Sequence, residues 1–185
     1  MLMPSLSNKN INTDSFNINN LKERLHKEQS KELIILEIAN NHMGNVDHGI
    51  KIIDELAKIK ESFSKYFDFA IKFQFRDLNS FIHPSFKGSN LKFVKRFEST
   101  KLTKKEWNIL FNRTKKYKFK LLATPFDEKS VKKILELNFK MIKIASCSLT
   151  DWPLVERISL TRKEVIFSTA GSSIEEIDSV VSFFQ

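Results

Sequence analysis

The sequence has 185 residues, 41% of them hydrophobic, so it is long enough for one domain with a sizeable core. Its formal net charge of +9 fits either a nucleic-acid partner or small anionic substrates. Its one cysteine, Cys147, excludes an internal disulfide and suits a reducing compartment, and we expect it to be a small, buried, apolar side chain.

Residues 1–30 are rich in Asn and Ser and lack the continuous apolar core of a secretory signal. We predict a mobile polar arm there, followed by a folded region over residues 31–185. No run approaches the ~20 apolar residues of a membrane span, so we expect a cytoplasmic protein with no membrane partner.

The lysines of "NRTKKYKFK" and "SVKKILEL" occur at helix-surface spacing, which predicts solvated faces. The sequence has no helix-turn-helix, zinc-finger or RNA-recognition signature, so we expect no nucleic-acid partner. A basic nucleic-acid module remains an alternative, which binding assays with DNA or RNA would exclude.

From residue 33 onward, short apolar runs alternate with stretches whose apolar residues recur at helical spacing. The predicted strands are 33–39, 69–75, 119–124, 140–146 and 164–169. The predicted helices are 48–63, 103–116, 128–137, one opened by Asp151 and Pro153, and 172–184. Helix starts are marked by capping boxes at Thr103 with Glu106 and Ser173 with Glu176, and by Asp127 as a cap.

In the last helix the predicted apolar stripe is Ile174, Ile177, Val181 and Phe184. A long segment, 76–102, separates the second strand from the next helix and receives no assignment.

Five strand–helix units in a row indicate a parallel sheet covered by helices. A doubly wound open sheet and a (β/α)₈ barrel are both α/β folds of this kind. A complete barrel needs eight units and typically ~250 residues, so length alone favours the open sheet.

Polar side chains stand at or near the carboxyl ends of all five predicted strands. In the second strand, Ala70, Lys72 and Gln74 share one face, and larger apolar residues share the other. Ligands of parallel α/β folds bind at this end of the sheet, and two lysines with several hydroxyls suit a ligand carrying phosphate and carboxylate. The candidate residues are Glu37, Lys72, Gln74, Thr124, Lys143, Ser146 and Ser168.

A structural alternative exists for Lys72, which could pair with a carboxylate such as Glu37 and serve only the sheet. Charges are rarely buried without a partner. The usual Gly-rich nucleotide cradles are absent, since the chain has only four glycines.

These residues lie in segments that resemble the sialic acid (N-acetylneuraminate) synthase family. The matching segments are "LEIANNHMGN", "AIKFQF", "LTKKEWNILF", "LLATPFD", "IKIASCSLTDWPLV" and "VIFSTAG", in the family's order over about residues 33–185. The resemblance implies a (β/α)₈ TIM barrel of which about five units are present, with later strands and a C-terminal antifreeze-like domain lying beyond this chain.

The resemblance also implies a transferase that condenses phosphoenolpyruvate with an N-acetylated amino sugar and releases phosphate. Lys72, Thr124, Lys143, Ser146 and Ser168 would bind phosphoenolpyruvate, with Gln74 beside Lys72. Glu37 would contact the sugar and assist the chemistry, whereas His42 is expected to make only a turn hydrogen bond. A divalent metal, Mn²⁺ or Mg²⁺, would polarise the sugar aldehyde, and its ligands are expected beyond this chain.

One departure from the family pattern is that Cys147 and Ser148 stand where Gly and Glu are common. Because the metal ligands and the antifreeze-like domain are expected beyond this chain, we expect residues 1–185 alone to be inactive. We also expect a homo-oligomer or a partner chain, because open barrel edges favour association. The alternatives are a non-catalytic remnant or assembly partner, and a related 3-deoxy sugar acid phosphate synthase. The sequence does not identify the amino sugar.

Overall fold

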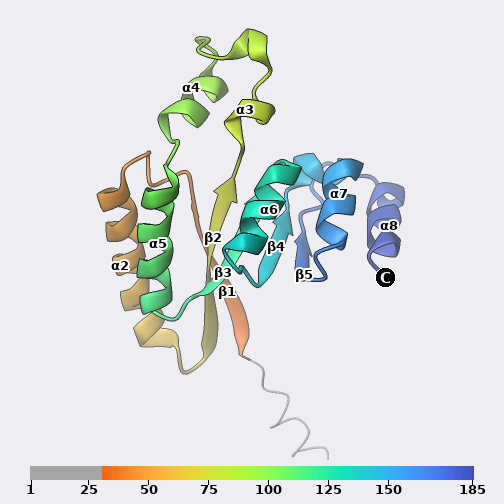
Figure 1. Cartoon of the computed structure of the whole chain (residues 1–185). Coiled ribbons are helices and arrows are strands. Elements are labelled where there is room, and N and C mark those ends of the chain that lie inside the picture. Colours follow the sequence, from red (N-terminus) through yellow and green to blue (C-terminus); the bar gives the residue numbers. More distant parts are fainter. Residues whose placement is uncertain (1–30) are drawn as a thin grey trace, which may run out of the picture. The chain divides into compact units, whose positions relative to one another are not determined.

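The computed structural model describes residues 31–185, and Glu32–Gln185 form one compact unit. Five parallel strands form one sheet in the order β1-β2-β3-β4-β5 (Figure 1). A doubly wound sheet reverses its strand order at a switch point, and this sheet does not reverse. The order is therefore that of a barrel segment, and the predicted arm over residues 1–30 lies outside the described residues.

The strands confirm all five sequence-predicted positions within a few residues. They span Glu32–Ala39 (β1), Phe67–Phe75 (β2), Lys120–Pro125 (β3), Met141–Ile144 (β4) and Glu164–Phe167 (β5). The register pairs Glu37 with Lys72 across β1 and β2, and Gln74 with Thr124 across β2 and β3. Polar residues of neighbouring strands therefore meet at the carboxyl end of the sheet.

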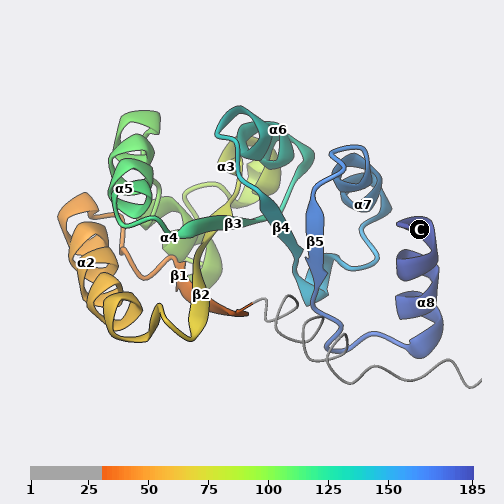
Figure 2. The same cartoon turned by 90° about the horizontal axis from the view of Figure 1, so that it is seen from below.

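The helices that follow the strands lie along one side of the curved sheet in chain order (Figure 2). They span Val46–Phe63 (α2), Lys104–Lys116 (α5), Glu128–Glu136 (α6), Trp152–Ser159 (α7) and Ile174–Phe183 (α8). Both predicted capping boxes are present, and Asp127 and Asp151 cap α6 and α7. These caps supply acceptors for backbone N–H groups that have no partner inside a helix.

The two faces of β2 have different surroundings, as its alternation predicts. Ile71, Phe73 and Phe75 point into the main core, where they meet the helices. Ala70 points to the other face, where it packs with a small apolar cluster that includes Leu122. The inner face therefore carries small apolar residues at its middle and polar residues at its carboxyl end.

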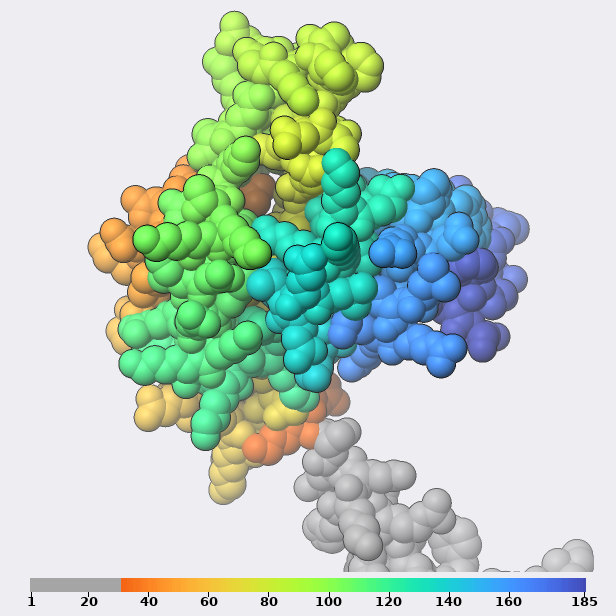
Figure 3. Space-filling view, in the orientation of Figure 1, coloured from red at the N-terminus to blue at the C-terminus, as the bar shows by residue number. Residues whose placement is uncertain are grey.

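The segment between β2 and α5 contains helical structure that the sequence did not predict. It forms α3 (Leu78–Phe81), a 3₁₀ turn (Pro84–Phe86) and α4 (Lys92–Ser99). This segment projects beyond the carboxyl end of the sheet, as Figures 1 and 3 show. It therefore stands at the end of the sheet that carries the candidate residues.

Two packing predictions were wrong. In α8, Ile174 and Val181 are exposed and Val180 is the buried residue, although Ile177 and Phe184 do pack against the core. Cys147 is exposed rather than buried, because it sits in the short 3₁₀ turn Ser146–Ser148, where Ser148 takes the inward position.

Candidate functional site

The centre of the candidate site is an ion pair between β1 and β2. Lys72 Nζ lies 2.5 Å from Glu37 Oε1, and the Lys72 side chain is 5% exposed while that of Glu37 is 45% exposed. The structure therefore confirms the pairing of Lys72 with Glu37 that the sequence suggested as an alternative. The ammonium lies inside the sheet's inner face, and the carboxylate reaches the solvent.

Gln74 extends this pair along the inner face. Its Nε2 donates to Glu37 Oε1 at 3.4 Å, and its Oε1 accepts from Arg76 Nη2 at 3.0 Å. Two oppositely charged neighbours therefore fix the orientation of the amide, with its oxygen toward the guanidinium. On the neighbouring strand, the Thr124 hydroxyl is buried and has no hydrogen-bond partner within the described residues.

Burial lowers the pKa of Lys72, and the nearby cations Lys143 and Arg76 lower it further, while Glu37 opposes the shift. Lys143 is therefore close enough to act on Lys72 electrostatically. Two cations that act on one another attract an anion, and Thr124, paired with Gln74 in the register, offers a hydroxyl donor on the neighbouring strand.

The two predicted serines follow the ends of β4 and β5. Ser146 begins the 3₁₀ turn after β4, and Ser168 donates its backbone N–H to Ile144 O at 3.1 Å. Neither serine side chain makes a hydrogen bond with another residue of the 31–185 region. Both are thus placed at the carboxyl end of the sheet, with hydroxyls free to donate.

Arg76 is a residue of this site that the sequence interpretation missed. Its guanidinium carbon lies 3.8 Å from the ring centre of Phe126, and Phe97 and Phe81 flank it at 4.6 and 5.8 Å. Desolvation lowers the Arg76 pKa to about 10. The available signal was the period of two, since Arg76, the first residue after β2, continues the spacing of Lys72 and Gln74.

The turn after β1 holds His42 in a structural position, as the sequence analysis expected. Its Nδ1 accepts from the Gly44 N–H at 3.1 Å, and its ring packs edge-on against Trp107 at 5.3 Å. Gly44 has φ +72°, and a Cβ there would lie 2.4 Å from Ser99 O. The glycine therefore allows the turn to approach the end of α4 closely.

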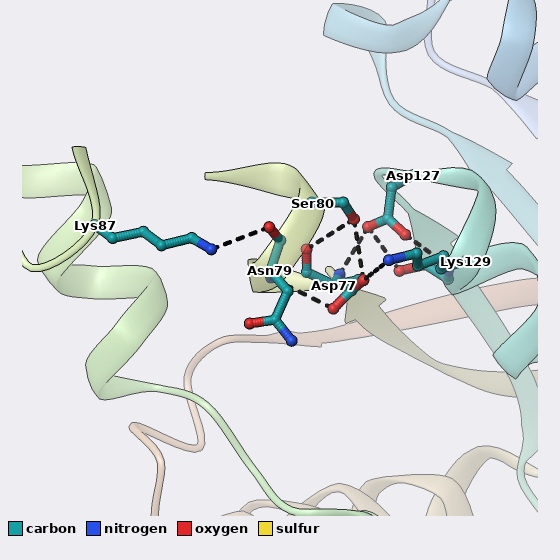
Figure 4. A network of polar contacts seen from close by, with 7 residues as sticks. Asp77, Asn79, Ser80, Lys87, Asp127 and Lys129 are labelled. Carbon is teal, nitrogen blue, oxygen red and sulfur yellow. Dashed lines mark hydrogen bonds and ion pairs between the residues drawn. The ribbon is translucent and has the colours of Figure 1, made fainter. Parts of the chain in front are cut away.

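A polar network joins the carboxyl ends of β2 and β3 (Figure 4). Asp127 accepts from the Asp77 N–H at 2.8 Å and from both the N–H and the hydroxyl of Ser130 at 2.8 and 2.9 Å. Asp77 in turn pairs with Lys129 at 2.9 Å and accepts from the Ser80 hydroxyl. The network fixes the start of the projecting segment to α6.

Lys133 of α6 contradicts the expectation that the lysines of "SVKKILEL" are all solvated. It is half-buried, with its ammonium 4.6 Å from the ring centre of Phe75 and 5.2 Å from that of Trp107. Burial lowers its pKa to about 8. Lys132, the preceding residue on α6, is exposed as expected.

This shift predicts a pH dependence of folding. Between the folded pKa of about 8 and the ordinary 10.5, the unfolded state binds more protons, so the free energy of unfolding rises with pH in that range. After discounting for solvent, we expect a rise of about 1 kcal/mol. Urea titrations between pH 7.5 and 10 should show it, and Lys133→Met should lose it while Lys132→Met retains it. Parallel pH profiles for wild type and Lys133→Met would contradict this assignment.

The described residues do not fit a divalent metal site. No group of three or more His, Cys, Asp and Glu side chains in residues 31–185 could hold a metal ion, and Glu37 is already engaged by Lys72 and Gln74. A divalent metal would therefore need ligands other than the described residues. Separately, no helix in the described part of the chain is long and apolar enough to cross a membrane.

Fold and site together define a barrel-type α/β protein with polar residues gathered at the carboxyl ends of its parallel strands. The family model described as the NeuB family matches residues 59–185. The chain belongs to the NeuB family. This confirms the resemblance that the strand-end motifs indicated.

Two relatives extend the comparison. An uncharacterized protein, MJ1065, from Methanocaldococcus jannaschii is 33% identical over 144 residues, which cover 78% of this chain and 39% of that protein. The N,N'-diacetyllegionaminic acid synthase of Campylobacter jejuni is 30% identical over 163 residues, covering 82% of this chain and 46% of the enzyme. The chain thus spans less than half the length of these relatives.

Solved structures confirm the fold. A putative spore coat polysaccharide biosynthesis protein E from Chromobacterium violaceum is 51% identical with a TM-score of 0.79, covering 83% of this chain and 45% of that chain. An N-acetylneuraminic acid synthetase from Leptospira borgpetersenii, in complex with citrate, is 31% identical with a TM-score of 0.69. The match covers 83% of this chain and 50% of that chain. A truncated 3-deoxy-D-arabino-heptulosonate 7-phosphate synthase from Thermotoga maritima is 12% identical with a TM-score of 0.53, so the likeness to it shows the fold alone. The five strands therefore form a half-barrel of the (β/α)₈ type.

Proposed function

We propose that this chain supplies the phosphoenolpyruvate-binding part of a synthase that makes a nonulosonic, sialic-type acid. One observation carries the proposal. Lys72 is a buried cation whose one carboxylate partner among the described residues is Glu37. A second cation, Lys143, acts on it electrostatically, and the buried Thr124 hydroxyl has no hydrogen-bond partner among the described residues. Membership of the NeuB family and the similarity to a legionaminic acid synthase support it.

The proposed reaction forms a carbon–carbon bond between the enol carbon of phosphoenolpyruvate and the aldehyde carbon of an N-acetylated amino sugar. Positive charge develops on the pyruvyl carbon, water adds there, and inorganic phosphate leaves. In this proposal Lys72 and Lys143 neutralise the phosphate and carboxylate, and Thr124, Ser146 and Ser168 donate hydrogen bonds.

Glu37 would face the sugar, since its carboxylate is the solvent-accessible member of the pair with Lys72. Gln74 would hold that carboxylate in place through its 3.4 Å hydrogen bond. The lysine keeps two further N–H donors for the phosphoenolpyruvate, so the ion pair and ligand binding are compatible.

A cytoplasmic location and self-association belong to the same proposal. β1 and β5 are the edge strands of the described sheet, each with a single neighbouring strand, and unpaired edges favour association. Light scattering of the purified chain would measure its oligomeric state.

The direct test is calorimetric titration of the purified chain with phosphoenolpyruvate. We expect saturable binding that is much weaker for pyruvate, which carries the carboxylate without the phosphate. A chain that folds but gives no saturable heat with phosphoenolpyruvate would contradict the proposal and favour a non-catalytic remnant.

A further inference from the structure

A second group of cations lies at the carboxyl end of β2, around a cavity of about 220 Å³. The cavity extends from Gln74 at the candidate site to residues of α5, α6 and the projecting segment. Phe75, Phe97 and Trp107 supply apolar lining. The charged residues that line it are Arg76, Asp77, Lys101 and Lys133.

The single acidic residue of this lining is already engaged. Asp77 pairs with Lys129 at 2.9 Å and accepts from the Ser80 hydroxyl at 3.0 Å. Its charge is therefore largely compensated from outside the cavity. The lining retains three cations against one carboxylate, a formal excess of two positive charges.

Neither of the two less exposed cations forms an ion pair or hydrogen bond with a carboxylate in residues 31–185, although Asp127 attracts both from a distance. The Lys133 ammonium lies over the rings of Phe75 and Trp107, and it makes no hydrogen bond or ion pair in that region. Arg76 donates one hydrogen bond, to Gln74, and its Nε is buried with no partner among the described residues. Aromatic rings can hold a cation in place, but they leave its N–H donors unused.

Two desolvated cations line one cavity, and neither forms an ion pair with a described residue, so the cavity has positive charge available for an anion. From this arrangement we propose that the cavity between α4, α5, α6 and the end of β2 binds a compact phosphate-class oxyanion, held by Arg76 and Lys133 with Lys101 at the rim. A dianion matches the formal excess charge of the lining. The volume is many times the roughly 10–15 Å³ of such space that one water molecule needs, which is room for a phosphate group with a small substituent.

This cavity adjoins the site proposed for phosphoenolpyruvate but uses other lysines. Lys72 and Lys143 lie on the inner face of the sheet, whereas Lys133 reaches over Phe75, which belongs to the helix-facing side. Gln74 borders both, because it lines the cavity and contacts Glu37. An anion at Arg76 therefore lies one side chain away from the Glu37–Lys72 pair.

Trp107 gives this cavity its own optical reporter. It lines the cavity and is 7% exposed, and the chain has only one other tryptophan, Trp152, which lies on α7. In a Trp152→Phe variant of the full chain, tryptophan emission comes from Trp107 alone. We expect inorganic phosphate, titrated at constant ionic strength, to change this emission saturably.

Matched substitutions in the Trp152→Phe background locate the anion. Lys133→Met keeps the apolar stem and should raise the half-saturating phosphate concentration about tenfold or more, whereas Lys133→Arg should retain binding. Lys132→Met, next to it on α6, should behave as the parent. Lys72→Ala should also leave the phosphate response unchanged, which separates this site from the phosphoenolpyruvate site.

Methyl phosphate and acetate are titrated alongside. Equal or tighter binding of methyl phosphate than of phosphate supports the site and indicates an ester ligand, and weaker binding indicates free phosphate. Any of three results overturns the proposal. They are the absence of a saturable change, a response that survives Lys133→Met but is lost in Lys72→Ala, and acetate binding as tight as that of phosphate.

Discussion

Replacing Lys72 with alanine is expected to weaken phosphoenolpyruvate binding by roughly a hundredfold, about 2.7 kcal/mol. Lys72 is buried beside Glu37, and Lys143 lies close enough to lower its pKa. Loss of its ammonium removes a charge that is shielded from water, so its interaction with a bound anion is stronger than that of an exposed lysine. Calorimetric titration with phosphoenolpyruvate measures the change.

Lys120→Ala is the matched control. Lys120 also lies in the sheet and is also ion-paired, with Asp68 at 2.7 Å, but it is at the amino-terminal start of β3 and half exposed. We expect wild-type affinity from this variant. We also expect Lys72→Ala to fold, because the Glu37 carboxylate that it leaves is in contact with solvent. Equal affinity of folded wild type and Lys72→Ala would contradict the placement of the ligand.

The fold could largely be predicted because its signals are local. Each strand is a short apolar run, and the helices begin at capping residues whose hydrogen bonds lie within three residues along the chain, such as the box of Thr103 and Glu106. In the segment between β2 and α5, the longest helix, α4, lacks such a signal. Helix α4 begins at Lys92, and its N-cap residue, Leu91, provides no side-chain hydrogen bond. Phe97 of this helix packs on Arg76, which is distant along the chain.

The site residues could be predicted only where they recur at every second position along a strand. Glu37, Lys72 and Gln74 alternate correctly along their strands, and the register brings them into contact. Lys133 gave no such signal, because a lysine on an amphipathic helix usually reaches the solvent. Its position depends on Phe75 and Trp107, which come from two other elements, so it required the three-dimensional structure.

The largest expected loss of stability comes from Phe73→Ala, on the face of β2 opposite Lys72. Phe73 is fully buried and packs edge-on against Phe111, Trp107 and Phe139, with ring centres 5.2, 5.9 and 6.2 Å away. Its removal leaves a cavity where β2, α5 and the segment before β4 meet. We expect a decrease in the free energy of unfolding of about 3–5 kcal/mol.

Urea denaturation of this variant should be compared with Phe93→Ala. Phe93 lies on α4 and is 67% exposed, so its removal should change the free energy of unfolding by less than about 0.5 kcal/mol. Because Phe73 and Lys72 are adjacent on one strand, loosening the core beneath β2 should also weaken phosphoenolpyruvate binding, even though Phe73 faces away from the site. A Phe73→Ala chain as stable as wild type would contradict the packing of the whole helix-facing layer.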